Sequence, residues 1–227
     1  MKRWMKILCV LMLVSLCLAC AKKEEVTPAE PEGNTPDKEV EPDTPVEPED
    51  DPAEEGKVLV LYFSRTGEQY NVGVIDEGNT AIVAKIIAEE TGADLFEVLP
   101  EDDYYPMTYD ELTEVAKQEQ NDNARPAYQG EIHPENYDTI FIGAPVWWGD
   151  WPMIMYTVFE SNDFSGKTLV PFNTHEGSGL SGFDRKLQNA CKDAQLLKAF
   201  STRGQNAQKN DDALRDEIGK WLAEIGY

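Results

Sequence analysis

The sequence predicts an α/β fold of three layers, in which a five-stranded parallel sheet lies between two layers of helices. Five short apolar runs have the length and composition of strands buried on both faces, at 58–63, 94–98, 138–144, 167–174 and 194–200. A segment with helical character follows each run, at 80–91, 109–120, 152–160, 182–191 and 211–226. Regular alternation of strand and helix predicts parallel strands joined by right-handed crossovers.

The first half of this pattern has the clearest periodicity. The run VLVLYF at 58–63 is continuous and apolar, as expected of a buried strand. The helix predicted over 80–91 has four aliphatic side chains on one face and ends at Gly92. The run DLFEV at 94–98 predicts the second strand, and residues 109–120 predict a polar-faced helix.

The second half repeats the alternation. The run DTIFIGA predicts a third buried strand, and Pro152 fits the first turn of the helix that follows it. The runs KTLVPFNT and AQLLKAF predict the fourth and fifth strands, with the helix GFDRKLQNAC between them. The segment DDALRDEIGKWLAEIG closes the chain as a helix. Ligands of such sheets bind beyond the carboxyl ends of the strands, so the loops after Phe63, Ala144 and Thr174 are the candidate site.

Residues 1–20 predict an export signal. Three positive charges precede thirteen mostly apolar residues, which is short of the roughly 20 that a membrane-spanning helix needs. The stretch CLAC, ending in Cys20, resembles the bacterial lipoprotein signal, in which the cysteine is acylated and becomes the mature N-terminus. Cys17 stands where that signal usually has leucine. An ordinary cleaved signal and an uncleaved anchor are the alternatives.

Residues 21–56 predict a disordered acidic tether. The segment holds seven prolines, fourteen Asp or Glu residues and no aromatic residue, so it cannot bury enough apolar surface to offset its ordering entropy. We expect it to hold a domain away from the membrane. Together with Cys20, it predicts a lipid-anchored protein on the extracytoplasmic face of a membrane in the bacterial cell envelope.

Residues 57–227 are sufficient for one domain with its own core. They contain 14 basic and 29 acidic residues, and this net charge argues against nucleic acid as a partner. Cys191 is their single cysteine, which excludes an internal disulfide, and we expect it to be an inert packed thiol. The sequence predicts no metal site.

The loop after the first strand predicts a phosphate site. It begins Ser64-Arg65-Thr66, and Asn79-Thr80 opens the next helix beyond the inserted residues 68–78. Hydroxyls and free N–H groups at a helix N-terminus bind phosphate without many cations, which suits an acidic domain. Taken alone, such a pattern is also that of an ordinary helix cap.

Three tryptophans follow the third strand in APVWWGDW, at 147, 148 and 151. Indoles at a ligand-binding edge are hard to explain as core packing and are suited to stacking on a flat conjugated ring. A protein-interaction patch is the alternative. The third loop contains GSGLSG, which fits a dinucleotide motif, but too few residues follow it to complete a dinucleotide-binding half. A glycine-rich loop beside a planar ligand accounts for it better.

These three loops carry a family resemblance. Residues 57–227 resemble flavodoxins and related FMN-dependent reductases, in particular the flavodoxin-like domains of bacterial lipoproteins. VLVLYFSRTG and GNTAIVAKII resemble the family's first strand, phosphate loop and first helix. DTIFIGAPVWWGD and LVPFNTHEGSG resemble its two loops around the isoalloxazine ring. The resemblance implies a flavodoxin-like fold with FMN as cofactor.

The resemblance also implies roles for particular residues. The FMN phosphate would be held by Ser64, Arg65, Thr66, Asn79 and Thr80. One side of the flavin ring would be lined by Pro145, Val146, Trp147, Trp148 and Gly149, and the other side by Thr174, His175, Glu176 and Gly177.

Two departures from the family concern the same site. The insertion 68–78 lengthens the phosphate loop, and we expect it to form a hairpin-like excursion that leans over the flavin. The second ring loop lacks the aromatic residue that often covers the outer face of the ring. Either His175 or Tyr70 fills that place, or the face is open to a substrate.

These observations predict a membrane-tethered protein that binds FMN and transfers electrons. They leave open whether it is a one-electron carrier or an FMN-dependent oxidoreductase that reduces quinones or similar small acceptors. Export separates it from soluble nicotinamide cofactors, so a redox partner protein in the membrane or a quinone is the expected partner. The alternative is a ligand-binding or scaffold lipoprotein that has lost its flavin, which the split phosphate loop favours.

Overall fold

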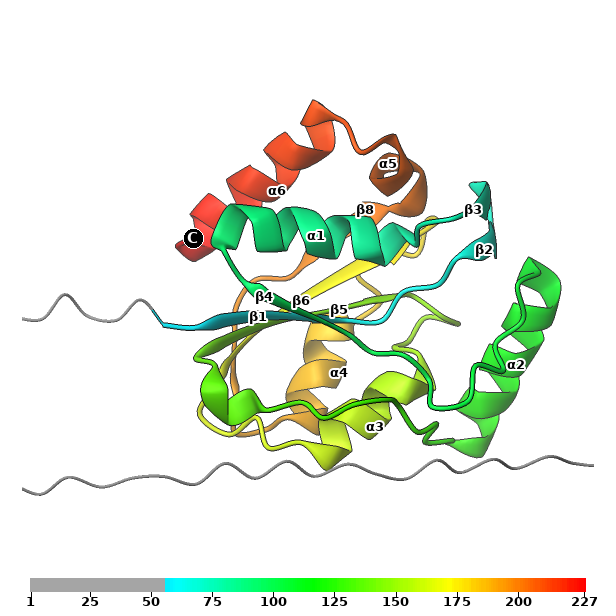
Figure 1. Ribbon diagram of the computed structural model, residues 1–227, viewed down its shortest axis with the longest axis horizontal. Helices are drawn as coiled ribbons and strands as arrows, with labels where there is room; N and C mark the ends of the chain where they lie inside the picture. Colours follow the sequence, from blue (N-terminus) through cyan, green and yellow to red (C-terminus); the bar gives the residue numbers. More distant parts are fainter. Residues whose placement is uncertain (1–55) are drawn as a thin grey trace, which may run out of the picture. The chain divides into compact units, whose positions relative to one another are not determined.

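The computed structural model describes residues 56–227 (Figure 1); the predicted signal, Cys20 and residues 21–55 lie outside the described residues. In chain order the elements are β1 Val58–Tyr62, β2 Gly67–Gln69, β3 Gly73–Ile75, α1 Asn79–Thr91, β4 Asp94–Glu97, α2 Tyr109–Asp122, a 3₁₀ turn Pro134–Asn136, β5 Thr139–Pro145, α3 Met153–Ser161, β6 Thr168–His175, α4 Phe183–Ala190, β7 Gln195–Leu196, β8 Phe200–Arg203, α5 Gly204–Lys209 and α6 Asp212–Ile225.

The main sheet has the order β4-β1-β5-β6, and both β7 and β8 pair with the outer edge of β6. Every one of these pairings is parallel. Five strand positions between helices confirm the predicted fold class. After β1 the chain adds β4 on one side and then β5 on the other, so the strand order switches direction between β1 and β5. A ligand is therefore expected beyond the carboxyl ends of β1 and β5.

The fifth strand differs from its prediction at 194–200. β7 pairs Thr168 with Gln195, whereas β8 pairs Phe172 with Phe200, so the chain has gained one residue between the two ladders. An extra residue of this kind interrupts a strand and lets it bend. The fifth strand of the sheet is therefore made of β7 and β8 and ends at Arg203. The short helix α5, which the sequence did not predict, begins immediately after it.

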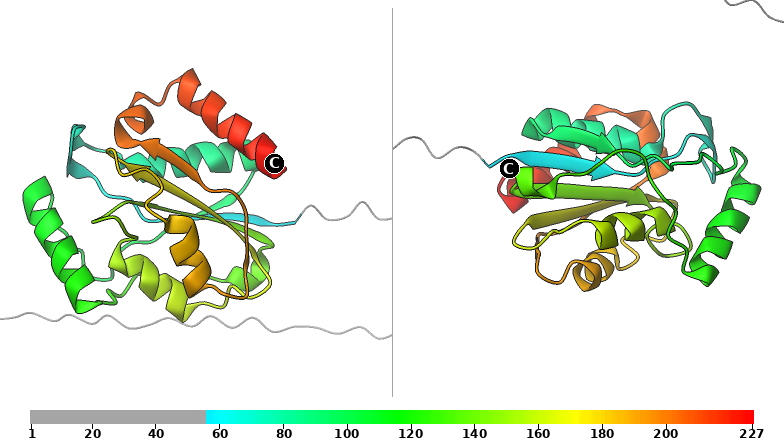
Figure 2. Two further views of the ribbon diagram at one scale, coloured as in Figure 1. Left: turned by 180° about the vertical axis from the view of Figure 1, so that it is seen from behind. Right: turned by 60° about the horizontal axis from the view of Figure 1, so that its bottom comes forward.

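Helices cover both faces of the sheet (Figures 1 and 2). Helices α1, α5 and α6 lie on one face, and α3 and α4 lie on the other. The alternation of β1 serves both cores, because Val60 and Tyr62 pack with α1 and α6 while Leu61 and Phe63 pack with α3 and α4. Cys191 is buried in the second of these cores, as expected of an inert thiol.

The inserted segment forms a two-stranded antiparallel hairpin, β2 and β3. It stands with α2 at the end of the molecule where the main strands finish (Figure 1). This confirms the expected hairpin-like excursion: the segment departs from the end of β1 and returns at the start of α1, and both of these elements keep their places in the fold.

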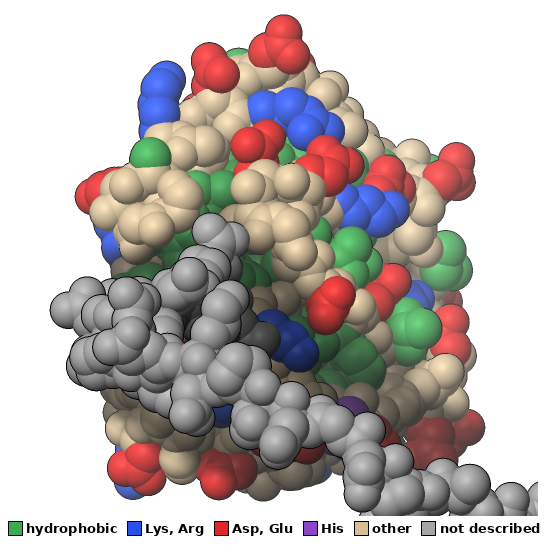
Figure 3. All heavy atoms as spheres, turned by 60° about the vertical axis from the view of Figure 1, so that its left-hand side comes forward, with side chains coloured by type: hydrophobic (Ala, Val, Ile, Leu, Met, Phe, Trp, Pro, Cys, Tyr) green, Lys and Arg blue, Asp and Glu red, His purple; other side chains and the backbone are tan. Residues whose placement is uncertain are grey.

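Acidic side chains are spread over the face in Figure 3, with basic ones among them. Within residues 56–227, no helix combines the length and the apolar character needed to cross a bilayer.

Candidate functional site

A cavity of about 280 Å³ lies at the carboxyl ends of the central strands. Eight of the fourteen predicted site residues line it: Asn79, Pro145, Val146, Trp147, Trp148, Thr174, His175 and Glu176. Gly149 and Gly177 belong to the same two loops without lining the cavity. The other lining residues are Gln69 and Tyr70 of the hairpin, Ser178, and Tyr109, Leu112, Thr113 and Ala116 of α2.

The loop after β5 presents two indoles in different ways. Trp147 is fixed by edge-to-face packing against Phe63 and Tyr105, with ring centroids 5.3 and 5.2 Å away. Trp148 is 54% exposed, and its Nε1 donates to the carbonyl oxygen of Thr113 in α2 at 2.9 Å. One wall of the cavity is thus a rigid ring and the other a ring that leans on a helix.

A tight turn sets the angle between these rings. Trp147 and Asp150 exchange two backbone hydrogen bonds of 2.9 Å, and the φ angles of Trp148 and Gly149 between them are +50° and +72°. Positive φ at both central residues defines a type I′ turn. Gly149 adopts its positive φ without the steric cost that a Cβ imposes, whereas Trp148 bears that cost.

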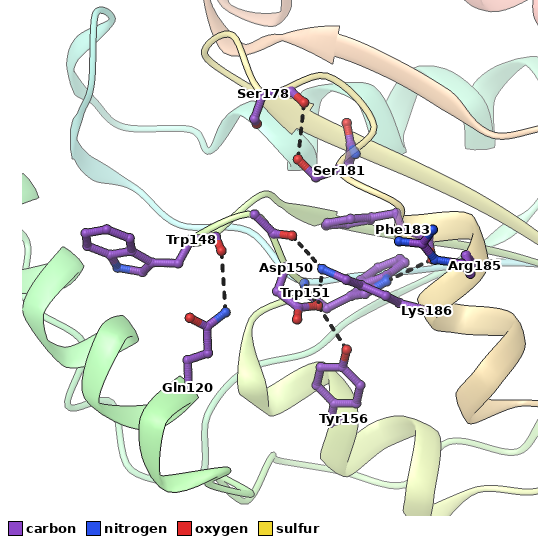
Figure 4. A network of polar contacts seen from close by, with 12 residues as sticks. Gln120, Trp148, Asp150, Trp151, Tyr156, Ser178, Ser181, Phe183, Arg185 and Lys186 are labelled. Atoms are coloured by element: carbon purple, nitrogen blue, oxygen red, sulfur yellow. Dashed lines mark hydrogen bonds and ion pairs between the residues drawn. The ribbon is translucent and has the colours of Figure 1, made fainter.

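Trp151 does not belong to the ligand site. Its side chain is 1% exposed, it stacks on Phe183 at a centroid distance of 3.8 Å, and its Nε1 donates to the Phe183 carbonyl oxygen (Figure 4). The expectation that all three tryptophans face a ligand was wrong for this one. Sequence spacing could not separate it from its neighbours, because the turn at 147–150 reverses the chain between them.

The loop after β6 has a defined hydrogen-bonding pattern. His175 Nδ1 accepts from the backbone N–H of Gly177 at 2.8 Å, so the neutral ring carries its proton on Nε2. Burial, and then the charge of Arg203, lower the pKa of His175, against an opposing effect of Glu176. The lowered pKa favours the neutral ring, which offers one N–H donor.

The start of α1 reaches the cavity through Asn79. Ser64 Oγ accepts from the backbone N–H of Ala81 at 3.0 Å, and a Cβ on Gly78 would collide with Ser64. Thr80 is buried, with its hydroxyl 2.8 Å from that of Thr174. The end of β1 and the start of α1 thus meet closely although the hairpin separates them in sequence, and the lengthened loop keeps the helix N-terminus beside the cavity.

Arg65 is directed elsewhere. Its guanidinium donates to Asp103 Oδ1 at 2.9 Å and to the carbonyl oxygen of Tyr105 at 2.7 Å, and it lies over the Tyr105 ring. These contacts attach the loop before α2 to the end of β1. Thr66 contributes its carbonyl oxygen to Gln69 Nε2 at 3.3 Å and, like Ser64, Arg65 and Thr80, does not line the cavity.

The hairpin and α2 together make the outer wall. Tyr70 stacks on Tyr109 with centroids 5.5 Å apart, and the carboxylate of Glu68 accepts from the backbone N–H of Tyr109 at 3.0 Å. Tyr70 and His175, the two candidates for the place of the absent aromatic residue, both line the cavity. The sequence predicts helix α2 at 109–120 but not its part in the site. The spacing of Leu112 and Ala116 on one face of a polar helix was the available signal.

Comparison with known proteins agrees with this geometry. A flavodoxin family model matches residues 57–225, so the chain belongs to the flavodoxin family. A search of curated proteins finds no match. The family assignment confirms the resemblance seen in the sequence, and the flavodoxin-like flavoprotein fold supports FMN as the cofactor.

Three solved structures illustrate the likeness. A candidate flavoprotein from Bacteroides eggerthii is 29% identical, with 76% of this chain and 99% of that one covered and a TM-score of 0.60. A second, from Bacteroides uniformis, is 31% identical, with 72% and 98% covered and a TM-score of 0.58. A flavoprotein from Lactobacillus acidophilus, solved in complex with FMN, is 21% identical, with 73% and 98% covered and a TM-score of 0.52. The last shares the fold.

Proposed function

We propose that the protein is a membrane-tethered, extracytoplasmic flavodoxin-like protein that binds FMN and transfers electrons. The observation that carries the proposal is the cavity itself, which is lined both by two indoles and by the N-terminal residue of a helix. That is the arrangement that a flat ring joined to a phosphate requires.

The described residues fit this cofactor. The flavin ring would lie against Trp147 and Trp148, with Tyr70 and Tyr109 at the outer wall. The phosphate would meet the free backbone N–H groups at the start of α1, where Asn79 lines the cavity. Bound FMN supplies the ability to take up and release one or two electrons. The aromatic walls would exclude water from the ring, and the neutral form of His175 adds a lining side chain with one N–H donor and no positive charge.

The proposed location rests on residues outside those the structure describes. Acylation of Cys20 and extension of residues 21–56 would hold the domain at the membrane on its extracytoplasmic side, in the bacterial cell envelope. Electrons would then pass between FMN and a redox partner protein or a quinone. Exposed apolar side chains of Tyr70, Val74 and Trp148 near the cavity support direct contact with such a partner.

The outer wall favours a one-electron carrier over a reductase that stacks its substrate on the ring. Tyr70 and Tyr109 contact each other, and Trp148 is hydrogen-bonded to α2, so three aromatic side chains stand where a second planar molecule would enter. A carrier needs only an exposed ring edge for electron exchange.

The visible spectrum tests the proposal. FMN at micromolar concentration is added to the purified protein, and binding is followed by the shift of flavin absorbance and the quenching of flavin fluorescence. We expect stoichiometric binding that Trp148→Ala weakens and Leu95→Ala does not, because Leu95 is exposed on the outer strand β4, away from the cavity. Absence of binding by the unaltered protein would instead support the flavin-free scaffold.

A further inference from the structure

The carboxylate of Glu176 is satisfied on one side only. Its Oε1 accepts from the backbone N–H of Gln205, the second residue of α5, at 2.9 Å. Its Oε2 is buried and has no hydrogen-bond partner among the described residues. The residue also lines the cavity. A residue of the wall of the proposed cofactor site thus carries an unpaired acceptor.

A buried acceptor without a donor raises the free energy of the protein, and a charged one raises it more. A ligand that brings a hydroxyl or N–H to the same place removes this cost on binding. A ligand with a hydroxyl or N–H donor facing Oε2 should therefore bind more tightly than a ligand without one. An anionic group at the same place would be repelled.

The surroundings of Glu176 indicate which part of the cofactor this donor belongs to. A Cβ on Gly204 would lie 2.8 Å from Glu176 Oε1 and would collide with the amide of Asn79, so both side chains converge on the start of α5. Asn79 is the first residue of α1, at the proposed phosphate end of the cavity. Glu176 therefore lies toward that end, whereas the indoles hold the ring.

Between the ring and the phosphate of FMN lies the ribityl chain, which carries hydroxyl groups. We propose that Glu176 Oε2 accepts a hydrogen bond from a ribityl hydroxyl, and that this contact makes binding depend on the presence of the ribityl chain. The inference rests on the proposed binding of FMN and deepens it, because it assigns to one carboxylate the recognition of a part of the ligand that neither the indoles nor the helix terminus contacts.

Glu176→Gln tests the assignment with little change of shape. The glutamine amide oxygen can still accept from Gln205, while its NH₂ group replaces the free acceptor. Dissociation constants are measured by fluorescence quenching on the full-length chain in detergent, freed of flavin, for FMN, riboflavin and lumiflavin. Asp76→Asn is the matched control, since Asp76 is an exposed carboxylate just before α1 that does not line the cavity.

We expect Glu176→Gln to weaken FMN and riboflavin by about 10- to 100-fold, the range for a hydrogen bond to a charged group. Lumiflavin, which has the ring but no ribityl chain, should bind the variant and the unaltered protein equally. Equal binding of FMN by both proteins, or an equal loss for lumiflavin, would overturn the assignment while leaving FMN binding intact. Failure of the unaltered protein to bind FMN would overturn the proposed function as well. Thermal unfolding of the variant without flavin checks that it is folded.

Discussion

Lys186 Nζ donates to the carbonyl oxygen of Gly149 at 2.5 Å and also pairs with Asp150 Oδ1 at 3.1 Å (Figure 4). Lys186 belongs to α4, so a helix on one face of the sheet holds the turn that presents Trp148. Tyr156 of α3 contributes a further bond to the same Asp150 oxygen, at 2.9 Å. The turn is thus anchored from two helices that do not themselves line the cavity.

Lys186→Met should loosen this anchor. We expect the FMN dissociation constant to rise about threefold to tenfold, with a loss of unfolding free energy of no more than about 1 kcal/mol, because the pair is partly exposed to solvent. Titration with FMN and urea denaturation measure the two effects. Lys192→Met, at an exposed lysine beyond the end of α4, is the control and should change neither quantity. An unchanged FMN affinity in Lys186→Met would show that the anchor does not matter for binding.

Thr80→Val should weaken FMN more than riboflavin. The buried hydroxyl lies 2.8 Å from that of Thr174 and does not line the cavity, so we expect it to turn to the phosphate when FMN binds. Such a charge-assisted bond is worth about 1.5–3 kcal/mol, and riboflavin has no phosphate. Isothermal titration with both ligands gives the difference. Equal losses for the two ligands would place the phosphate elsewhere in the lengthened loop.

Arg65→Met provides the contrast to Thr80→Val. Because its guanidinium is bonded to Asp103 and to the Tyr105 carbonyl, we expect a loss of about 2 kcal/mol of unfolding free energy. The ratio of FMN to riboflavin affinity should stay the same. A selective loss of FMN would mean that Arg65 turns toward the phosphate when the cofactor binds.

Trp148→Ala and Trp151→Ala should affect different properties: the first should weaken FMN binding, and the second should lower the stability of the fold. Trp151 is a buried core side chain, so its truncation should cost about 3–5 kcal/mol of unfolding free energy. Trp148 is half exposed, so its truncation should change stability by less than about 1 kcal/mol while weakening FMN about tenfold. Urea denaturation and FMN titration of both variants separate the two roles.

His175 should make stability depend on pH. The pKa of His175 is lowered in the folded protein. The contribution of the neutral ring to the free energy of unfolding is therefore complete above about pH 6.5, the ordinary pKa in the unfolded chain. As the pH falls, the unfolded state binds a proton first, and the contribution is lost down to the folded pKa. His175→Asn cannot titrate, so the stability advantage of the flavin-free wild-type protein over this variant should shrink from pH 7.5 to pH 5. A constant difference in urea midpoint over that range would contradict the prediction.

Cys20→Ala should release the protein from membranes without unfolding the domain. The segment after residue 20 is acidic and almost free of large apolar side chains, so nothing in 21–56 is suited to anchor the chain. Fractionation of cells that express the variant measures the release, and FMN binding by the released protein shows that the domain is folded. Retention of the variant in the membrane fraction would show that the anchor is not a lipid on Cys20.

The sequence by itself determined the order of strands and helices and the location of the site. Continuous apolar runs such as 58–63 and 138–144 can be buried on both faces only as inner parallel strands, and this is a local property of the chain. Parallel strands end at one edge, so the loops at 64–67, 144–151 and 173–182 had to meet. Eight of the predicted residues line one cavity for that reason.

Tertiary structure alone decided which side chains in those loops face the cavity. Trp148 and Trp151 are the same residue type and only three positions apart in the chain. A turn with positive φ nevertheless places one at the surface and the other in the core. Arg65 is held by residues about 40 positions away, and Glu68 caps a helix 41 positions away. Contacts between segments so distant in the chain have no local pattern, because they depend on how the hairpin and α2 pack once the sheet has formed.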